Sequence, residues 1–299
     1  MTPRLGWSTL GLPPLRDDED ISRALAVVTE SGFNTLEVHL NETLALDGPQ
    51  LINDPLRRRL TAIVHEMRRR GGTCLLGLGG RHLLSNEKHQ PTLFAPDVGA
   101  RALRLKLVSE TIALAGELGV DAVIFLSGPS PRALAADKHG SDDWARFVES
   151  MAALARAAER AGVTLAPEAH SRHLFAGLAD LAALRAALPS PALGLTGDTV
   201  HQTIVEGEPL DTLYARAAPA LTHIQLDNLA AVPAAGAAIA HAPITVAGAV
   251  DLAAAIRGLR AGGYSRAIGV EFLAVDHPTV DPLTYCREAG AWLRAATSG

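Results

Sequence analysis

Two short apolar runs, separated by a helical stretch, decide the fold of this chain. The first run is Val163-Thr-Leu-Ala-Pro-Glu168, and the second is Leu193-Gly-Leu-Thr-Gly-Asp198. Each has the pattern of a buried β-strand that ends on a carboxylate, and residues 177–188 between them have a helical pattern. A strand, a helix and a second strand in this order indicate a parallel βαβ unit.

The same alternation extends outward from this unit over all 299 residues. We predict strands over residues 5–10, 33–39, 73–78, 121–126, 163–168, 192–198, 221–227 and 267–272. Helices are predicted over residues 18–31, 54–70, 98–118, 142–161, 177–188, 209–217, 250–261 and 282–296. Eight strand–helix units without a composition break favour an α/β fold, a single (β/α)8 TIM barrel domain over residues 1–299.

A doubly wound open sheet is the competing fold. It would carry a Gly-rich phosphate turn after its first strand, whereas this chain has Leu10-Gly-Leu-Pro-Pro14 there. We therefore prefer the barrel.

The composition bounds the class of protein. The chain is 48% hydrophobic and 20% charged, as ordinary globular proteins are, and its net charge of −5 disfavours a nucleic-acid partner. The two cysteines, Cys74 and Cys286, have the spacing of neither a disulfide framework nor a zinc finger. No signal-peptide core or membrane-length apolar segment is visible, so we expect a cytoplasmic enzyme without a membrane partner.

Four side chains with oxygen ligands end consecutive predicted strands in the second half of the chain: Glu168, Asp198, Gln225 and Glu271. The carboxyl ends of barrel strands meet at one face, where barrel enzymes carry their chemistry. Three carboxylates gathered there would repel one another, and the amide would lack a partner, unless a cation bound between them. We therefore predict one divalent metal ion, Mn²⁺ or Mg²⁺ in the first place, with Zn²⁺ or Co²⁺ as alternatives.

Histidines close to these residues are further candidates. His223 lies two residues before Gln225 and on the same face of the strand, which makes it a rival for the fourth ligand position. We prefer Gln225 because it lies nearer the strand end. His201 is predicted to contact substrate or a metal ligand, and His170 either contacts substrate or simply lines the barrel mouth.

The first half of the chain supplies the remaining candidates. Glu37 and His39 share an inward face of the second predicted strand; we expect Glu37 to be a structural hydrogen-bonding residue and His39 to reach substrate. After the third strand comes the polar segment Gly79-Gly-Arg81-His82. It is either a substrate clamp, with Arg81 and His82 as contacts, or a simple solvated loop.

Taken together, these motifs resemble the xylose-isomerase-like TIM barrel superfamily of sugar-phosphate isomerases and epimerases. The resemblance covers essentially the whole chain and rests on Pro167-Glu168-Ala-His170, Gly197-Asp198-Thr-Val-His201, His223-Ile-Gln225-Leu-Asp227 and Gly269-Val-Glu271-Phe. It implies that Glu168, Asp198, Gln225 and Glu271 bind the metal, and that Glu168 and Glu271 also move a carbon-bound proton. The His-Ile-Gln form is similar to hydroxypyruvate isomerase, since ketose 3-epimerases usually have His at the Gln225 position.

The resemblance implies a divalent-metal-dependent isomerase or epimerase of a small sugar, sugar acid or sugar phosphate, acting through a metal-stabilised enediolate. A metal-dependent dehydratase of the 3-dehydroshikimate or inosose type is the alternative with the same enolate chemistry. An apurinic endonuclease-like enzyme is disfavoured because its Asp-x-His pair is missing: His241 follows Ile239 and Ala240.

The expected partner is therefore a small polyol or keto-acid substrate. The loop after the seventh strand has no Arg before Arg257, so we expect Arg81 or Arg172 to supply any positive charge that the substrate needs. The oligomeric state stays open between a monomer and a symmetric homodimer.

Overall fold

The structure is a computed structural model and describes residues 3–40, 44, 51–234 and 237–298. Eight parallel strands form its main sheet. These are β1 (Arg4–Ser8), β2 (Thr35–His39), β3 (Thr73–Leu78), β4 (Ala122–Phe125), β5 (Thr164–Pro167), β6 (Leu195–Asp198), β7 (Leu221–Leu226) and β10 (Ala267–Val270). The first predicted strand, over residues 5–10, was too long, because residues 9–11 turn into the 3-10 helix η1 (Thr9–Gly11).

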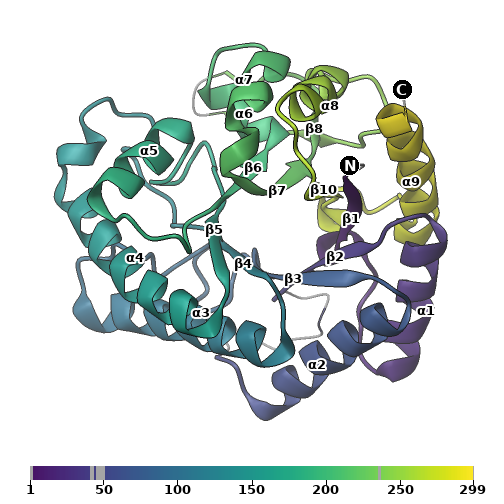
Figure 1. Cartoon of the computed structure of the whole chain (residues 1–299), viewed down its shortest axis with the longest axis horizontal. Helices are drawn as coiled ribbons and strands as arrows, with labels where there is room; N and C mark the ends of the chain where they lie inside the picture. Colours follow the sequence, from purple (N-terminus) through teal and green to yellow (C-terminus); the bar gives the residue numbers. More distant parts are fainter. Residues whose placement is uncertain (1–2, 41–43, 45–50, 235–236, 299) are drawn as a thin grey trace.

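The sheet curls into a nearly closed barrel (Figure 1). Its strand order is β5-β4-β3-β2-β1-β10-β7-β6, and every neighbouring pair is parallel. The two end strands are joined by the parallel bridges Leu165↔Leu193 and Glu168↔Thr196. The predicted (β/α)8 barrel is thereby confirmed, and the carboxyl ends of all eight strands face one side.

Helices surround the barrel (Figure 1). They are α1 (Asp18–Glu30), α2 (Asp54–Arg69), α3 (Val98–Leu118), α4 (Asp142–Ala161), α5 (Leu178–Ala187), α6 (Thr199–Val205), α7 (Leu210–Ala217), α8 (Leu252–Ala261) and α9 (Pro282–Ser298). Three further 3-10 turns are η3 (Lys138–Gly140), η4 (Ala218–Ala220) and η5 (Ala274–Asp276). The short helix α6 was not predicted as a separate element. None of the helices in the described ranges is long and apolar enough to cross a membrane.

Local chemistry explains where the helices start and stop, as α4 illustrates. The Ser141 hydroxyl accepts a hydrogen bond from the backbone N–H of Trp144 and so caps the first turn. The helix ends at Gly162, whose φ of 67° is a left-handed conformation that glycine adopts without steric cost.

The barrel separates two environments. Alternate residues of β4 face outward, where Val123 and Phe125 join the large core between sheet and helices. Ala122 and Ile124 face inward, into a small separate cluster with Leu75 and Ala166. Elsewhere the interior is lined by buried polar side chains, among them Glu37, His39, His223 and Gln225. Buried polar groups need partners, so this part of the barrel is where chemistry is expected.

Candidate functional site

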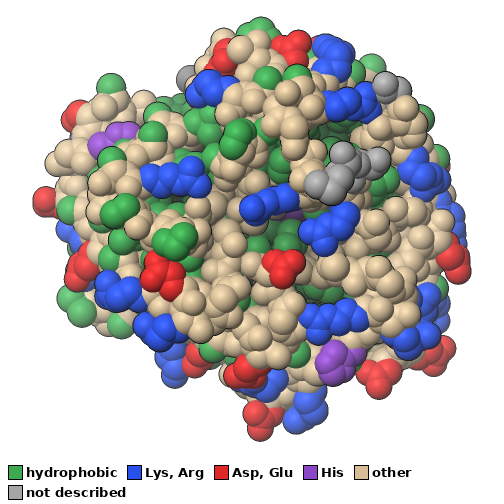
Figure 2. Space-filling model, in the orientation of Figure 1, with side chains coloured by type: hydrophobic (Ala, Val, Ile, Leu, Met, Phe, Trp, Pro, Cys, Tyr) green, Lys and Arg blue, Asp and Glu red, His purple; other side chains and the backbone are tan. Residues whose placement is uncertain are grey.

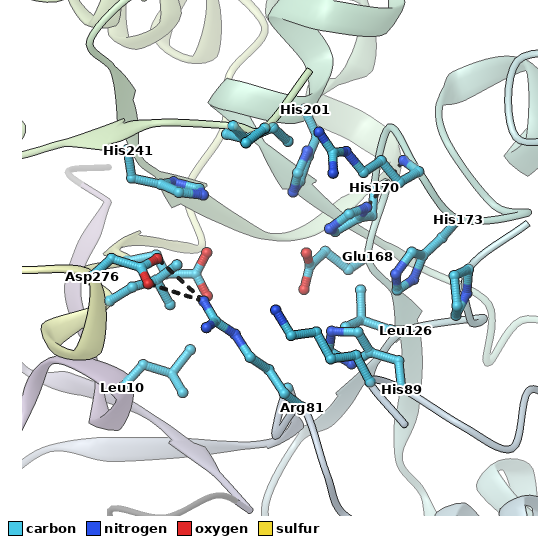
Figure 3. Close-up of a pocket in the computed structure, with 18 residues that line it drawn as sticks. Leu10, Arg81, His89, Leu126, Glu168, His170, His173, His201, His241 and Asp276 are labelled. Atoms are coloured by element: carbon cyan, nitrogen blue, oxygen red, sulfur yellow. Dashed lines mark hydrogen bonds and ion pairs between the residues drawn. The ribbon is translucent and has the colours of Figure 1, made fainter. Parts of the chain in front are cut away.

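A cavity of about 460 Å³ opens at the carboxyl ends of the strands. The segments that follow β3, β4, β5, β6, β7 and β10 all contribute side chains to its wall (Figure 3). The space-filling view shows the molecule from the amino-terminal ends of the strands, so the cavity opens on the side turned away from the viewer, at the carboxyl ends (Figure 2). A concave site at this end of a barrel is the place where substrates of barrel enzymes bind.

Asp198 is placed by the turn from β6 into α6. It ends the strand, and its Oδ1 accepts a 2.8 Å hydrogen bond from the backbone N–H of His201, so the carboxylate is the N-cap of α6. Its second oxygen, Oδ2, is buried and has no hydrogen-bond partner within the part of the chain that the structure describes. One carboxylate oxygen is thus used by the fold and the other is left for a ligand.

The structure brings the predicted acids Asp198 and Glu271 together, leaves Glu168 outside their cluster, and adds one acid that the sequence prediction missed. Asp198, Asp227 and Glu271 each offer an oxygen, and these oxygens lie within 4.8 Å of one another, an arrangement that could hold a metal ion. Asp227 was not predicted as a ligand. The signal was available, since His223, Gln225 and Asp227 follow one another at the two-residue spacing of a single strand face.

Ionisation of these acids is unfavourable in the protein alone. Burial raises the pKa of Glu168 and of Glu271 well above the usual range, and the neighbouring carboxylates raise both further. Burial, with the charge of Asp227, raises the pKa of Asp198 to about 7. A divalent cation among these oxygens would reverse this repulsion, so the donor set fits a hard divalent metal.

Gln225 points its amide in a direction that suits a metal ligand. Its Nε2 donates a 2.8 Å hydrogen bond to Oε1 of Glu37 and lies 3.5 Å from Oε1 of Glu271. An ionised carboxylate only accepts hydrogen bonds, so the NH₂ group must face Glu37 and the amide oxygen must face away. That oxygen, Oε1, is buried without a hydrogen-bond partner among the described residues.

His223, the rival for the fourth ligand, lies deeper in the barrel. Its Nε2 is 3.1 Å from Oε2 of Glu37, and its ring is fully buried and does not line the cavity. The neighbouring strand makes room for it with Gly269, where a Cβ atom would come within 2.7 Å of Nε2. This geometry supports Gln225 over His223 as the ligand.

His39 also turns to Glu37 rather than to the cavity. Its Nδ1 accepts a 3.0 Å hydrogen bond from the backbone N–H of Gly79, so Nε2 carries the proton that bonds Oε1 of Glu37 at 2.7 Å. Both nitrogens are therefore occupied, and His39 does not line the cavity. Although burial opposes its ionisation, Glu37 has a lowered pKa, because its interactions with His39 and His223 outweigh that effect.

Two predicted histidines do reach the cavity. His170 and His201 both line it (Figure 3), with ring centroids 3.7 Å apart. Nδ1 of His201 is 3.0 Å from the Ser171 hydroxyl. Burial lowers the pKa of His170 well below the usual range and that of His201 to about 3. Both rings are therefore neutral hydrogen-bonding groups at neutral pH.

Of the two predicted substrate contacts in the segment after β3, one lines the cavity and the other does not. Arg81 lines the cavity, where its guanidinium lies 3.2 Å from a carboxylate oxygen of Asp276. His82 is exposed and does not line the cavity. Further along the same loop, Lys88 and His89 reach the wall beside Arg81 instead. The length and irregularity of this loop explain why the sequence did not show which side chains turn inward.

His241 is a further residue that sequence reasoning did not place in the site. It lies on β9 (His241–Ala242), which pairs antiparallel with β8 (Asn228–Leu229) in the segment after β7. This hairpin brings Nδ1 of His241 into a hydrogen bond with Asp227, while the ring lines the cavity (Figure 3). Because Asp227 lies between β7 and β8 whereas His241 lies on β9, 14 positions further on, no local sequence motif indicated the pair.

Comparisons with known proteins agree with this architecture. A family model described as a xylose isomerase-like TIM barrel matches residues 25–296. A search of curated proteins finds no significant match.

Solved structures of sugar epimerases share the fold. A structure of L-ribulose 3-epimerase has a TM-score of 0.74 and 18% identity, over 99% of this chain and 95% of the other. D-allulose 3-epimerase from Methylomonas sp., in complex with D-allulose, has a TM-score of 0.71 and 15% identity, over 98% and 97% of the two chains. The IOLI protein with a binding zinc atom has a TM-score of 0.75 and 15% identity, over 99% and 98%.

Proposed function

Because the chain belongs to the xylose isomerase-like TIM barrel family, we propose that it is a divalent-metal-dependent epimerase or isomerase of a small sugar or sugar derivative. Two buried oxygens carry the proposal: Oδ2 of Asp198 and Oε1 of Gln225, which have no hydrogen-bond partner in the described part of the chain. Both residues lie near Glu271, which lines the cavity. Buried polar atoms are normally satisfied, so these two oxygens indicate a missing cationic partner.

Asp198, Asp227 and Glu271 would hold the ion through carboxylate oxygens that lie within 4.8 Å of one another. Gln225, through its amide oxygen, and Glu168, which lies outside that cluster, would complete the donor set. All five donors are oxygens, which suits Mn²⁺ or Mg²⁺, and the zinc atom of the IOLI protein keeps Zn²⁺ as an alternative. When bound, such an ion polarises the carbonyl and hydroxyl oxygens of a polyol and so acidifies the adjacent C–H bond.

Glu168 and Glu271 are positioned for the proton transfer. They follow β5 and β10, with β6 and β7 between those strands in the barrel, so the two side chains approach the cavity from different sides. In Figure 3 the Glu168 carboxylate reaches into the open space. One carboxylate would take a proton from carbon on one face of the substrate, and the second carboxyl group would return a proton on the other face.

Other groups of the cavity wall suit this role. Burial and neighbouring carboxylates raise the pKa values of the two glutamates only in the metal-free protein; a bound cation would lower them, so the proton would be taken by a carboxylate oxygen that the metal does not hold. Neutral His170 and His201 provide hydrogen bonds to substrate hydroxyl groups, and the ion pair of Arg81 with Asp276 lies at the cavity wall. Together these groups orient a polyhydroxylated ligand.

A dehydratase is the second candidate, and the pair of His241 and Asp227 favours it. Burial opposes the charge of His241, but the hydrogen bond and the charge of Asp227 outweigh that effect and raise its pKa. A protonated imidazole in the cavity wall can donate a proton to a departing hydroxyl group. The same enolate could then lose water instead of being reprotonated at carbon.

Proton exchange in D₂O tests the proposal and separates these candidates. The purified protein, reconstituted with Mn²⁺, is incubated with a panel of ketopentoses, ketohexoses, their phosphates and keto sugar acids, and the reactions are followed by NMR and mass spectrometry. We expect deuterium at the carbon next to the carbonyl, formation of an epimer or isomer, and loss of both on addition of EDTA. Glu271→Gln should reduce the exchange rate by at least about 100-fold. Loss of water from the substrate would favour the dehydratase, and exchange unaffected by EDTA would refute the metal-dependent mechanism.

A further inference from the structure

A buried guanidinium without a counter-ion lies next to the cavity wall. Arg104, on α3, is 1% exposed, and its Nη2 donates a hydrogen bond to the carbonyl oxygen of Leu126 at 3.4 Å. Its Nε and Nη1 are buried and have no partner among the residues that the structure describes. Burial lowers its pKa to about 10, so the group stays charged at neutral pH. A buried positive charge is costly unless an anion lies nearby.

Two histidines of the cavity wall lie within the field of this charge. His89 and His173 both line the cavity, and their ring centroids are 5.2 Å apart. The Nδ1 atom of each ring is buried and unpartnered among the described residues, and after burial itself the charge of Arg104 is a cause of the lowered pKa of both. A nearby cation disfavours the protonated imidazolium, so each ring stays neutral with one N–H that can donate a hydrogen bond.

The exposed cations of the same wall also lack carboxylate partners. Lys88 and Arg172 both line the cavity, and neither forms an ion pair within the described residues. The Arg172 guanidinium donates to the carbonyl oxygen of Ala237. Arg81, in contrast, is neutralised by Asp276. The wall formed by the segments after β3 and β5 therefore carries unbalanced positive charge.

We propose that this basic wall, defined by Lys88, His89, Arg172 and His173 with Arg104 behind them, binds an anionic group of the substrate. The anion is a phosphate or a carboxylate, and it lies away from the oxygens that meet the acidic end of the cavity. Barrel enzymes often hold phosphate after strands seven and eight, but residues 227–251 of this chain contain neither Lys nor Arg. The inference rests on the proposed function and narrows its substrate to sugar phosphates or sugar acids.

Direct binding measurements test this wall without relying on turnover. Inorganic phosphate and acetate are titrated by calorimetry at constant ionic strength into the full-length protein, both metal-free and Mn²⁺-loaded. The double variant Lys88→Met/Arg172→Leu removes two exposed cations of the wall. Lys106→Met removes an exposed cation of α3 that does not line the cavity, and serves as the matched control.

We expect saturable binding of at least one of the two anions, whichever is the natural group, by both metal-free and Mn²⁺-loaded protein. Affinity should fall by about tenfold or more in the double variant and remain unchanged in the control. No saturable binding by the wild type, or equal affinity in the double variant, would overturn the inference. Binding that requires Mn²⁺ and ignores the double substitution would also overturn it, while leaving the proton-exchange result as the separate test of the proposed function.

Discussion

The carboxylate of Glu37 on β2 accepts a 2.8 Å hydrogen bond from Nε2 of Gln225 on β7, in the interior of the barrel. The same carboxylate bonds His39 at 2.7 Å and His223 at 3.1 Å. Three buried donors thus converge on one buried acceptor from three directions. Because Glu37 holds the NH₂ group of Gln225, it also determines that the amide oxygen is free for a ligand.

Replacing Glu37 by Gln should therefore weaken both the fold and the metal site. The substituted amide has the same shape but carries a donor of its own, so at least one of the three converging donors loses its partner. We expect a loss of about 2–3 kcal/mol in the free energy of unfolding and roughly a tenfold loss of metal affinity. Urea denaturation and Mn²⁺ calorimetry measure the two effects. His65→Gln, at an exposed position of α2, is the control, and unchanged metal affinity in Glu37→Gln would show that Glu37 does not orient the ligand.

Paired substitutions distinguish the two rivals for the fourth ligand. Gln225→Leu removes the unpartnered oxygen and should lower Mn²⁺ affinity by about tenfold or more. His223→Gln keeps a donor near Glu37 and should lower stability by about 1–2 kcal/mol, with metal affinity changed by less than about threefold. Calorimetry with Mn²⁺ on both variants reads out the difference. The opposite ranking would assign the ligand to His223.

These residues also show how far sequence reasoning reached. The alternation of strands and helices predicted the barrel correctly, because few other folds have eight strictly alternating strand–helix units. The convergence of His39 and His223 on Glu37 was not predicted, because Glu37 and His223 are 186 positions apart and meet only when the barrel closes. Periodicity reports which face a side chain occupies, but not how deep in the barrel it lies.

The contact between Asp227 and His241 was not predicted from the sequence, for a related reason. His241 was considered only as a member of a local Asp-x-His motif, whereas the structure joins it to Asp227 through the β8–β9 hairpin. His82 was expected to contact substrate on the strength of its place after a strand, yet it lies on the surface while His89 lines the cavity. Loop residues are not constrained by a repeating pattern, so their directions follow from tertiary contacts alone.

The effect of Asp198→Asn on the free energy of unfolding should depend on pH and on bound metal. The pKa of Asp198 is raised from 3.8 to about 7, so the folded state binds more protons than the unfolded state between these values. Stability of the metal-free protein contributed by this group is therefore lost as pH rises from about 4 to 7. Asparagine keeps the N-cap of α6 without the charge.

Metal-free Asp198→Asn should accordingly be more stable than the wild type at pH 8, by on the order of 1–3 kcal/mol, with a smaller difference at pH 5. Adding Mn²⁺ at pH 8 should stabilise the wild type more than the variant. Thermal unfolding at the two pH values, with and without Mn²⁺, measures this. A variant that is less stable than the metal-free wild type at pH 8 would contradict the assignment of repulsion to Asp198.

Asp180 anchors the segment that carries His173. Its Oδ2 accepts hydrogen bonds from Lys138 Nζ at 2.7 Å and from the backbone N–H of Ala176 at 2.6 Å, and its Oδ1 lies 2.6 Å from Nε2 of His139. Asp180→Ala would leave the ammonium of Lys138 buried without its carboxylate partner. We expect a loss of about 3 kcal/mol in the free energy of unfolding. Asp137→Ala removes a carboxylate that is 77% exposed and should cost less than about 0.5 kcal/mol, and equal losses in both variants would refute the anchoring role.

The central claim is that the acids at the barrel mouth hold a divalent metal, and metal content tests it most directly. The full-length protein is purified without chelator, loaded with Mn²⁺, desalted and measured by elemental mass spectrometry, beside the double variant Asp198→Asn/Glu271→Gln. We predict about one ion per wild-type chain and less than about a tenth of an ion per variant chain, with both proteins folded by circular dichroism. A wild type without metal above background, or a variant that retains as much metal as the wild type, would contradict the account.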